Sequence, residues 1–174
     1  GREVSVLNLF AYTGIATLAA AKAGAKVCHV DASKGIVSWA KQNAELSGLK
    51  DAPIRYIVDD CKKFLEREIR RGHKYDAVIM DPPSYGRGPS GEIWKLEDGI
   101  DELIGLVTEV ISDDPLFVLV NSYTTGLSAS TVGYMLNLHL VSRFGGRVSC
   151  DEIGIPVTQT KSALPAGSSA RWEK

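Results

Sequence analysis

The sequence predicts an α/β fold: a doubly wound, mainly parallel seven-stranded sheet with an antiparallel C-terminal edge hairpin. Short apolar runs rich in β-branched residues alternate with helix-favouring segments along most of the chain. The spans between them are short, which favours βαβ units and a parallel sheet. The last two strand-like runs follow one another with no helix between them. The 174 residues suit a single domain, 1–174.

The expected strands share an apolar, β-branched composition. They cover Val4–Phe10, Lys26–Val30, Ile54–Val58, Tyr75–Met80, Leu116–Val120, Arg147–Val157 and Ser162–Trp172. The first five should be parallel, and the last two should pair as the hairpin. Pro156 and Pro165 restrict pairing in that hairpin to sheet edges or strand ends, because proline has no backbone N–H.

Helix-favouring segments fill the gaps between these strands. They are the Ala-rich Ile15–Ala23, the segment from Ser33 to Gly48, the segment from Asp60 to Gly72, the amphipathic Leu96–Ile111, and Ser128–Leu140. Candidate N-caps, chosen for a side-chain oxygen at the helix start, are Thr13, Ser33, either Asp59 or Asp60, and Ser128. A loop rich in Gly and Pro is expected over Ser84–Gly91.

Composition narrows the classes of function. Lys and Arg number 20 against 21 Asp and Glu, so a globally basic nucleic-acid binder is disfavoured, although a local basic face is compatible. Three irregularly spaced cysteines favour a reducing, cytoplasmic location over a disulfide framework. No apolar run is long enough for a membrane helix, and no signal peptide is visible. His29, His73 and His139 lack metal-ligand spacing, so no metal site is expected.

Chemistry-bearing residues follow the ends of the expected parallel strands, where open α/β sheets bind ligands. Gly14 enters the first helix, and Asp31 ends the second strand, where a carboxylate can accept both hydroxyls of a ribose. Asp59 and Asp60 end the third strand. Either carboxylate can cap the next helix, and for Asp60 this role is as well supported as binding a ligand. The glycines of a G-x-G-x-x-G dinucleotide motif are absent, which disfavours a nicotinamide-dependent dehydrogenase.

The turn after the fourth strand reads Asp81-Pro82-Pro83-Ser84-Tyr85. Its prolines remove two N–H donors, so carbonyls and the Asp81 carboxylate remain as acceptors beside the flat Tyr85 ring. Such a site suits a planar target that carries an amino group, whereas a rigid turn alone does not require Asp and Tyr at its two ends.

These residues resemble a known family. The stretch LNLFAYTGIATLAAAKAGAKVCHVDASKGIVSWAKQNAELSGL, the Asp59-Asp60 pair and YDAVIMDPPSYG are similar to class I S-adenosylmethionine-dependent methyltransferases. The likeness is strongest to bacterial ribosomal RNA large-subunit methyltransferases, and it runs from about Val4 to Tyr123. It implies a Rossmann-like methyltransferase fold, S-adenosyl-L-methionine as cofactor and RNA as partner.

The resemblance also implies residue roles. Phe10, Ala11, Tyr12, Thr13 and Gly14 would surround the methionine part of the cofactor, Asp31 with Ala32 and Ser33 the ribose, Asp60 and Cys61 the adenine, and Asp81, Pro82 and Tyr85 the methyl group and acceptor. Asn8 replaces an acid that is common in the wider superfamily. The family's usual region before the first motif has no counterpart here, so we expect weak cofactor retention and low activity relative to a longer parent.

One departure bears on the reaction. Cytosine-C5 enzymes of this type carry a cysteine nucleophile after the fifth strand, where this chain reads Val120-Asn121-Ser122-Tyr123-Thr124. Covalent addition is what activates cytosine C5. Cys28 and Cys150 are expected to be buried or inert, and Cys61 belongs to the cofactor side. We therefore expect transfer to a ring or amino nitrogen and not to cytosine C5. The alternatives are a protein or small-molecule methyltransferase, or an inactive cofactor-binding domain.

Overall fold

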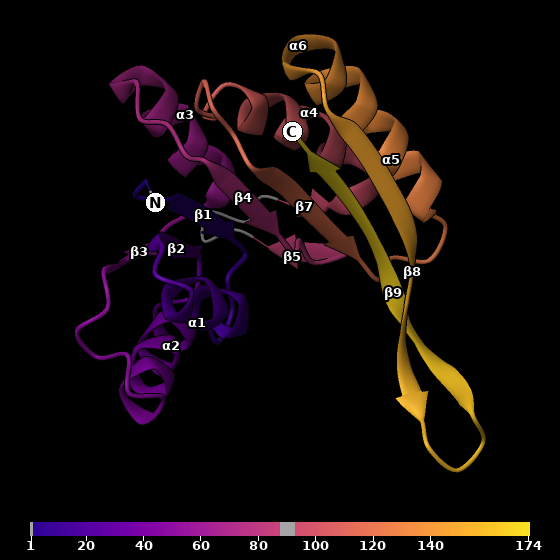
Figure 1. Cartoon of the computed structure of the whole chain (residues 1–174), viewed down its shortest axis with the longest axis horizontal. Helices are drawn as coiled ribbons and strands as arrows, with labels where there is room; N and C mark the ends of the chain where they lie inside the picture. The colour runs from indigo at the N-terminus through magenta and orange to yellow at the C-terminus, as the bar shows by residue number, and fades with distance from the viewer. Residues whose placement is uncertain (1, 88–92) are drawn as a thin grey trace.

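The computed structural model describes residues 2–87 and 93–174. It confirms the predicted seven-stranded sheet, whose strand order is β3-β2-β1-β4-β7-β9-β8 (Figure 1). The strands are β1 Ser5–Leu9, β2 Lys26–Asp31, β3 Ile54–Val58, β4 Ala77–Met80, β7 Phe117–Ser122, β8 Arg147–Val157 and β9 Ser162–Glu173. Neighbours from β3 through β7 in this order are parallel. Strand β9 runs antiparallel to both β7 and β8, and β8 and β9 form the expected edge hairpin.

Helices cover both faces of the sheet, so it is doubly wound as predicted. The helices α1 Ile15–Lys22 and α2 Lys34–Leu46 lie on one side, and α3 Cys61–Arg71, α4 Leu96–Thr108 and α5 Ala129–Leu136 lie on the other (Figure 1). Successive side chains of a strand point to opposite faces of the sheet, so β1 contributes residues to both sides. Leu7 and Leu9 belong to the large core under α3, α4 and α5, whereas Val6 joins Ala21 in a smaller cluster.

The helix starts agree with the sequence at three positions and differ at one. Thr13 is not the cap of α1. Gly14 occupies the N-cap position with φ 92°, and no side chain makes a capping hydrogen bond there. The confirmed caps accept a hydrogen bond from a backbone N–H three residues on, and these pairs are Ser33 with Ile36, Asp60 with Lys63, and Ser128 with Thr131.

Two segments depart further from the prediction. The loop expected over Ser84–Gly91 contains strand β5 Tyr85–Arg87, which pairs with β6 Ile93–Lys95, while 88–91 lies outside the described residues. The last predicted helix is α-helical only to Leu136 and continues as the π-helical turn Asn137–Val141 and the short α6 Ser142–Phe144. Helix α4 ends at Thr108, short of the predicted Ile111, which instead forms an isolated parallel bridge with Tyr75.

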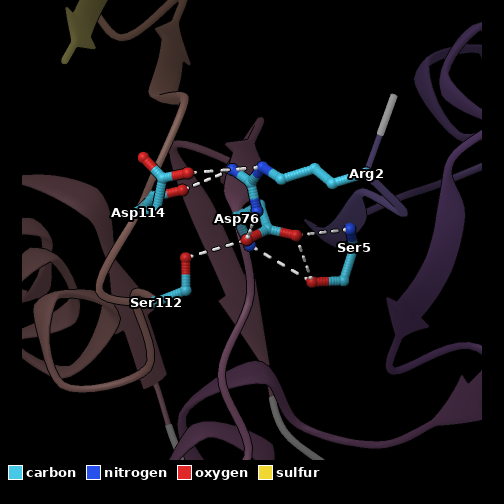
Figure 2. Close-up of polar contacts among 5 residues, drawn as sticks. All are labelled: Arg2, Ser5, Asp76, Ser112 and Asp114. Carbon is cyan, nitrogen blue, oxygen red and sulfur yellow. Dashed lines mark hydrogen bonds and ion pairs between the residues drawn. The ribbon is translucent and has the colours of Figure 1, made fainter.

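A polar cluster fixes the amino end of the sheet, opposite the strand ends that the motifs follow (Figure 2). The Asp76 carboxylate accepts hydrogen bonds from the Ser5 backbone N–H at 2.8 Å and hydroxyl at 3.0 Å, from Arg2 at 2.8 Å and from Ser112 at 2.8 Å. Arg2 also pairs with Asp114, with Nε 3.4 Å from the carboxylate. Burial alone would raise the pKa of Asp76, but these donors lower it to about 2.

Among the described residues, no helix combines the length and apolar character needed to cross a bilayer. The same part of the chain brings together no group of three or more His, Cys, Asp or Glu residues suited to a metal ion.

Candidate functional site

A pocket of about 370 Å³ lies at the carboxyl ends of the parallel strands. Its lining comes from segments that follow β1, β2, β3, β4 and β7. The lining residues are Phe10, Tyr12, Asp31, Ala32, Asp60, Cys61, Lys62, Asp81, Pro83, Gly86, Trp94, Leu103 and Tyr123. Seven of the residues selected from the sequence therefore meet around one hollow: Phe10, Tyr12, Asp31, Ala32, Asp60, Cys61 and Asp81.

The loop after β1 has an unusual backbone. Phe10 has φ 53°, Tyr12 has φ 47° and Gly14 has φ 92°, so three of its five residues lie in the left-handed region. Non-glycine residues rarely adopt this conformation, and clusters of it are typical of ligand sites. A side chain at Gly14 would also meet Ala40 at 3.3 Å. The loop thus turns its backbone sharply over the carboxyl end of the sheet.

Asp31 holds this loop in place. Its two carboxylate oxygens accept backbone hydrogen bonds from Tyr12, at 3.0 Å, and from Ser33, at 2.9 Å. Each oxygen of an ionised carboxylate has a second acceptor site. Asp31 can therefore take two further donors from a ligand in the pocket while it stabilises the loop.

Asp60 and Cys61 form the next part of the wall, at the start of α3. One Asp60 oxygen caps the helix by accepting the Lys63 N–H at 2.9 Å, which leaves its other oxygen for a ligand. The Phe10 backbone N–H donates to the Cys61 sulfur over 3.4 Å. Burial raises the pKa of the Cys61 thiol well above its usual range, so this thiol stays protonated.

The turn after β4 carries the remaining acid. Asp81 is open to the pocket, yet partial removal of water by its neighbours raises the pKa of its carboxyl group. The turn is tied on one side by the Trp94 indole N–H, which donates to the Pro83 carbonyl at 2.8 Å. On the other side the Thr124 hydroxyl donates to the Ser84 hydroxyl at 2.7 Å. The position of Asp81 is therefore fixed by segments distant in the sequence.

Tyr123 stands where the loop after β7 reaches the pocket, and its side chain is 58% exposed. Its pKa is raised by desolvation and by the nearby charge of Asp81, so the phenol keeps its proton at neutral pH. The sequence lacks a cysteine here, and Tyr123 was not expected to line the pocket. The feature that indicates this role is an aromatic residue directly after a strand.

Other selected residues lie outside the lining. Ala11 and Pro82 are buried, and Thr13 accepts the Asn43 amide through its carbonyl at 2.9 Å. Tyr85 is 50% exposed on β5, opposite Lys95. Gly14 and Ser33 shape the loop and cap α2, as described above.

A buried polar chain supports the loop from below. The Asn8 amide donates to the Thr17 hydroxyl at 2.9 Å, and that hydroxyl lies 2.9 Å from His29 Nδ1. The Thr17 hydroxyl and His29 Nδ1 thus share a hydrogen bond, whose donor depends on the tautomer of the ring. Burial lowers the pKa of His29 to about 4, so the imidazole is neutral at pH 7. Asn8 thus has a structural place beneath the pocket.

The open parallel sheet, with acids at successive strand ends around one pocket, defines a nucleoside-binding α/β protein. The family described as S-adenosylmethionine-dependent methyltransferase matches residues 1–126, so the chain belongs to that family. S-adenosylmethionine is the cofactor of this family.

Similar proteins agree with this assignment. The SAM-dependent methyltransferase from Agrobacterium tumefaciens superposes with a TM-score of 0.92 at 40% identity, over 99% of this chain and 56% of that one. The structure of SMU.776 complexed with SAH gives a TM-score of 0.73 at 22% identity, over 96% of this chain and 45% of that one, and supports the fold.

Curated relatives match over part of the chain. Ribosomal RNA large subunit methyltransferase K/L of Shewanella frigidimarina is 33% identical over 68% of this chain and 17% of its own length. Ribosomal RNA large subunit methyltransferase I of Aeromonas salmonicida is 42% identical over 46% of this chain and 20% of its own length. The chain thus spans a fifth or less of these two relatives.

Proposed function

We propose that this chain is a catalytic domain that transfers the methyl group of S-adenosylmethionine to a ring or amino nitrogen of RNA, and not to cytosine C5. The observation that carries the proposal is the convergence of Asp31, Asp60 and Asp81 on one pocket at the carboxyl ends of the sheet. The naming of two curated relatives as ribosomal RNA methyltransferases supports RNA as the acceptor.

In this proposal each acid has a separate task. Asp31 accepts the ribose hydroxyls with the lone pairs that the backbone leaves open, and the uncapped oxygen of Asp60 accepts the adenine amino group. The Phe10–Gly14 loop encloses the methionine part. Gly14 has no Cβ atom and adopts a left-handed conformation, so a ligand can approach the backbone of this turn closely.

Asp81 and its turn then serve the acceptor. The bound cofactor supplies an activated methyl group on a positively charged sulfur. During transfer the S–CH3 bond breaks as an N–CH3 bond forms, and the acceptor nitrogen loses a proton, for which Asp81 is the nearby base. The pocket contributes alignment and exclusion of water. The Pro82 carbonyl and Tyr85 are assigned to the acceptor side by the family resemblance, and Tyr123 joins them because it lines the pocket beside Asp81.

The cysteines support nitrogen over cytosine C5. Cys61 is the cysteine in the pocket lining, and its buried thiol is held protonated. Burial raises the pKa of Cys28 to about 11, inside the sheet. Cys150 is exposed, and it lies on β8 along a different hollow. A thiolate nucleophile aimed at the acceptor therefore has no source near Asp81.

The test is methyl transfer from S-adenosyl-[methyl-3H]methionine to three fractions: total RNA, protein and small metabolites. We expect label in RNA, in an N-methylated nucleoside after digestion and chromatography. Asp81→Ala should lower the rate by about a hundredfold, the usual scale of a lost general base, whereas Asp51→Ala, in an exposed turn before β3, should not change it. Label in 5-methylcytidine would contradict the nitrogen assignment, and label confined to protein or metabolites would contradict RNA.

A further inference from the structure

Trp94 separates two hollows of the molecule. It lines the 370 Å³ pocket, and it also lines a second hollow of about 640 Å³ whose walls come from α3, β6 and the start of α4. Asp60 and Lys62 also line both hollows. The indole therefore stands at the end of the pocket where α3 begins.

The indole is held from three directions before any ligand arrives. Its N–H donates to the Pro83 carbonyl at 2.8 Å. Its ring lies 5.9 Å from the Phe10 ring, centroid to centroid, with a tilt of 35°. On the third side it rests on Gly99 of α4, where a Cβ atom would lie 2.5 Å from Cζ3 of the indole. Any side chain at Gly99 would displace the ring.

These contacts join two separate walls of the pocket. Phe10 belongs to the loop after β1, and Pro83 belongs to the turn that carries Asp81. A single indole thus bridges the loop after β1 and the turn after β4. A flat aromatic wall beside a free carboxylate oxygen is the chemistry that recognises a purine base, since the ring offers stacking and the acid accepts an amino group.

We propose that Trp94, seated on Gly99, is a cofactor-positioning residue that forms the wall for the adenine ring of S-adenosylmethionine. The assignment rests on the proposed placement of the cofactor in this pocket. Its consequence is that a substitution in α4, at a residue that touches no ligand, weakens cofactor binding through the indole.

The first test is the fluorescence change on titration with S-adenosylhomocysteine. The chain has three tryptophans, of which Trp172 is fully buried and Trp39 is 52% exposed on α2. We expect a ligand-dependent change in the wild type that persists in Trp39→Phe and disappears in Trp94→Phe. A change that persists in Trp94→Phe would overturn the proposal.

The second test compares two glycines of one helix by calorimetric titration with S-adenosylhomocysteine. Gly99→Ala should weaken binding by about tenfold or more, the scale of one lost aromatic stack. Gly105→Ala is the matched control, because a Cβ there meets His139 only at an ordinary 3.5 Å. Both changes favour the helix by a similar amount, so helix stability cannot account for a difference.

Two further variants separate the ring from its N–H. Trp94→Ala should match Gly99→Ala, whereas Trp94→Phe, which keeps a flat ring and loses the donor, should weaken binding only by about threefold to fivefold. Equal affinity in the wild type, Gly99→Ala and Trp94→Ala would overturn the proposal.

These titrations need no methyl acceptor, so a failure to detect RNA methylation would not contradict the role of Trp94. A wild-type chain that does not bind S-adenosylhomocysteine at millimolar concentration would contradict the pocket assignment and the role of Trp94 together.

Discussion

In the function proposed above, the Asp31 carboxylate has two tasks. Its oxygens accept the Tyr12 and Ser33 backbone N–H groups, and this shapes the loop that would enclose the cofactor. Asp31 also lines the pocket, where its remaining lone pairs would accept donors of the ligand. In this proposal loop stability and ligand affinity are coupled, because the same negative charge strengthens both sets of hydrogen bonds.

We predict that Asp31→Asn weakens binding of S-adenosylhomocysteine by about tenfold to a hundredfold. The amide replaces one accepting oxygen by a donor and removes the charge, and hydrogen bonds to charged groups contribute about 1.5–3 kcal/mol. Calorimetric titration measures the effect. Asp51→Asn is the control, and an Asp31→Asn variant with wild-type affinity would exclude Asp31 from the binding site.

Some residues of the site could be predicted from the sequence, and others could not. Asp31, Asp60 and Asp81 directly follow apolar strands, and the carboxyl ends of parallel strands meet at one edge. Trp94 and Leu103 enter the same pocket from a later hairpin and helix. Their placement depends on how α4 packs on the sheet, which no local pattern of the sequence encodes.

At the scale of elements, the strands β1, β2 and β4 are buried on both faces and have mainly apolar sequences, and this is why they could be predicted to within two residues. The hairpin of β5 and β6 was missed because its short strands, such as Tyr85–Arg87, carry no alternating pattern. Thr13 was wrongly expected to cap α1 because a strained loop leads into the helix, and Gly14 tolerates the left-handed conformation of φ 92° that the cap position requires.

The Asp76 cluster shows how separate elements are fixed together. One carboxylate joins β1 through Ser5, the chain start through Arg2 and the segment before β7 through Ser112 (Figure 2). The folded-state pKa of about 2 lies below the ordinary 3.8. This stabilisation is therefore present above pH 4 and is lost as the pH falls toward 2.

We predict that Asp76→Asn lowers the free energy of unfolding at pH 7 by about 2 kcal/mol, the value that follows from the lowered pKa. Urea denaturation followed by circular dichroism measures it. Asp114→Asn, at a side chain that is 82% exposed, should cost less than about 0.5 kcal/mol. Equal losses in the two variants would show that the Asp76 network is not the source of stability.

At the scale of the whole molecule, the loop after β1 and the core both pack on one buried histidine, His29, whose protonation at low pH would destabilise the fold. His29 lies beneath Gly14, fully buried, and its Nε2 atom has no hydrogen-bond partner among the residues that the structure describes. Its folded-state pKa of about 4 is below the ordinary 6.5, so the unfolded chain binds a proton first as the pH falls. The stabilisation is complete above pH 6.5 and is lost between pH 6.5 and pH 4.

We predict that the wild type loses about 3 kcal/mol of stability to this one group between pH 7 and pH 4. His29→Gln should show a shallower decline over the same range, measured by urea titration at several pH values. The control is His139→Gln, near the surface on the turn after α5. A His29→Gln variant that declines as steeply as the wild type would assign the acid sensitivity elsewhere. Asp76 then governs the range below pH 4.

The β8–β9 hairpin extends past the end of β7 and carries its far end away from the helices (Figure 1). Because β8 is the last strand of the sheet, one side of its backbone is open to another strand. The register shifts between Ile153 and Gly154, and Pro156 removes a backbone donor two residues on. A strand from a second molecule could therefore follow β8 without interruption only up to Ile153, and the irregularities beyond that residue limit edge-to-edge aggregation.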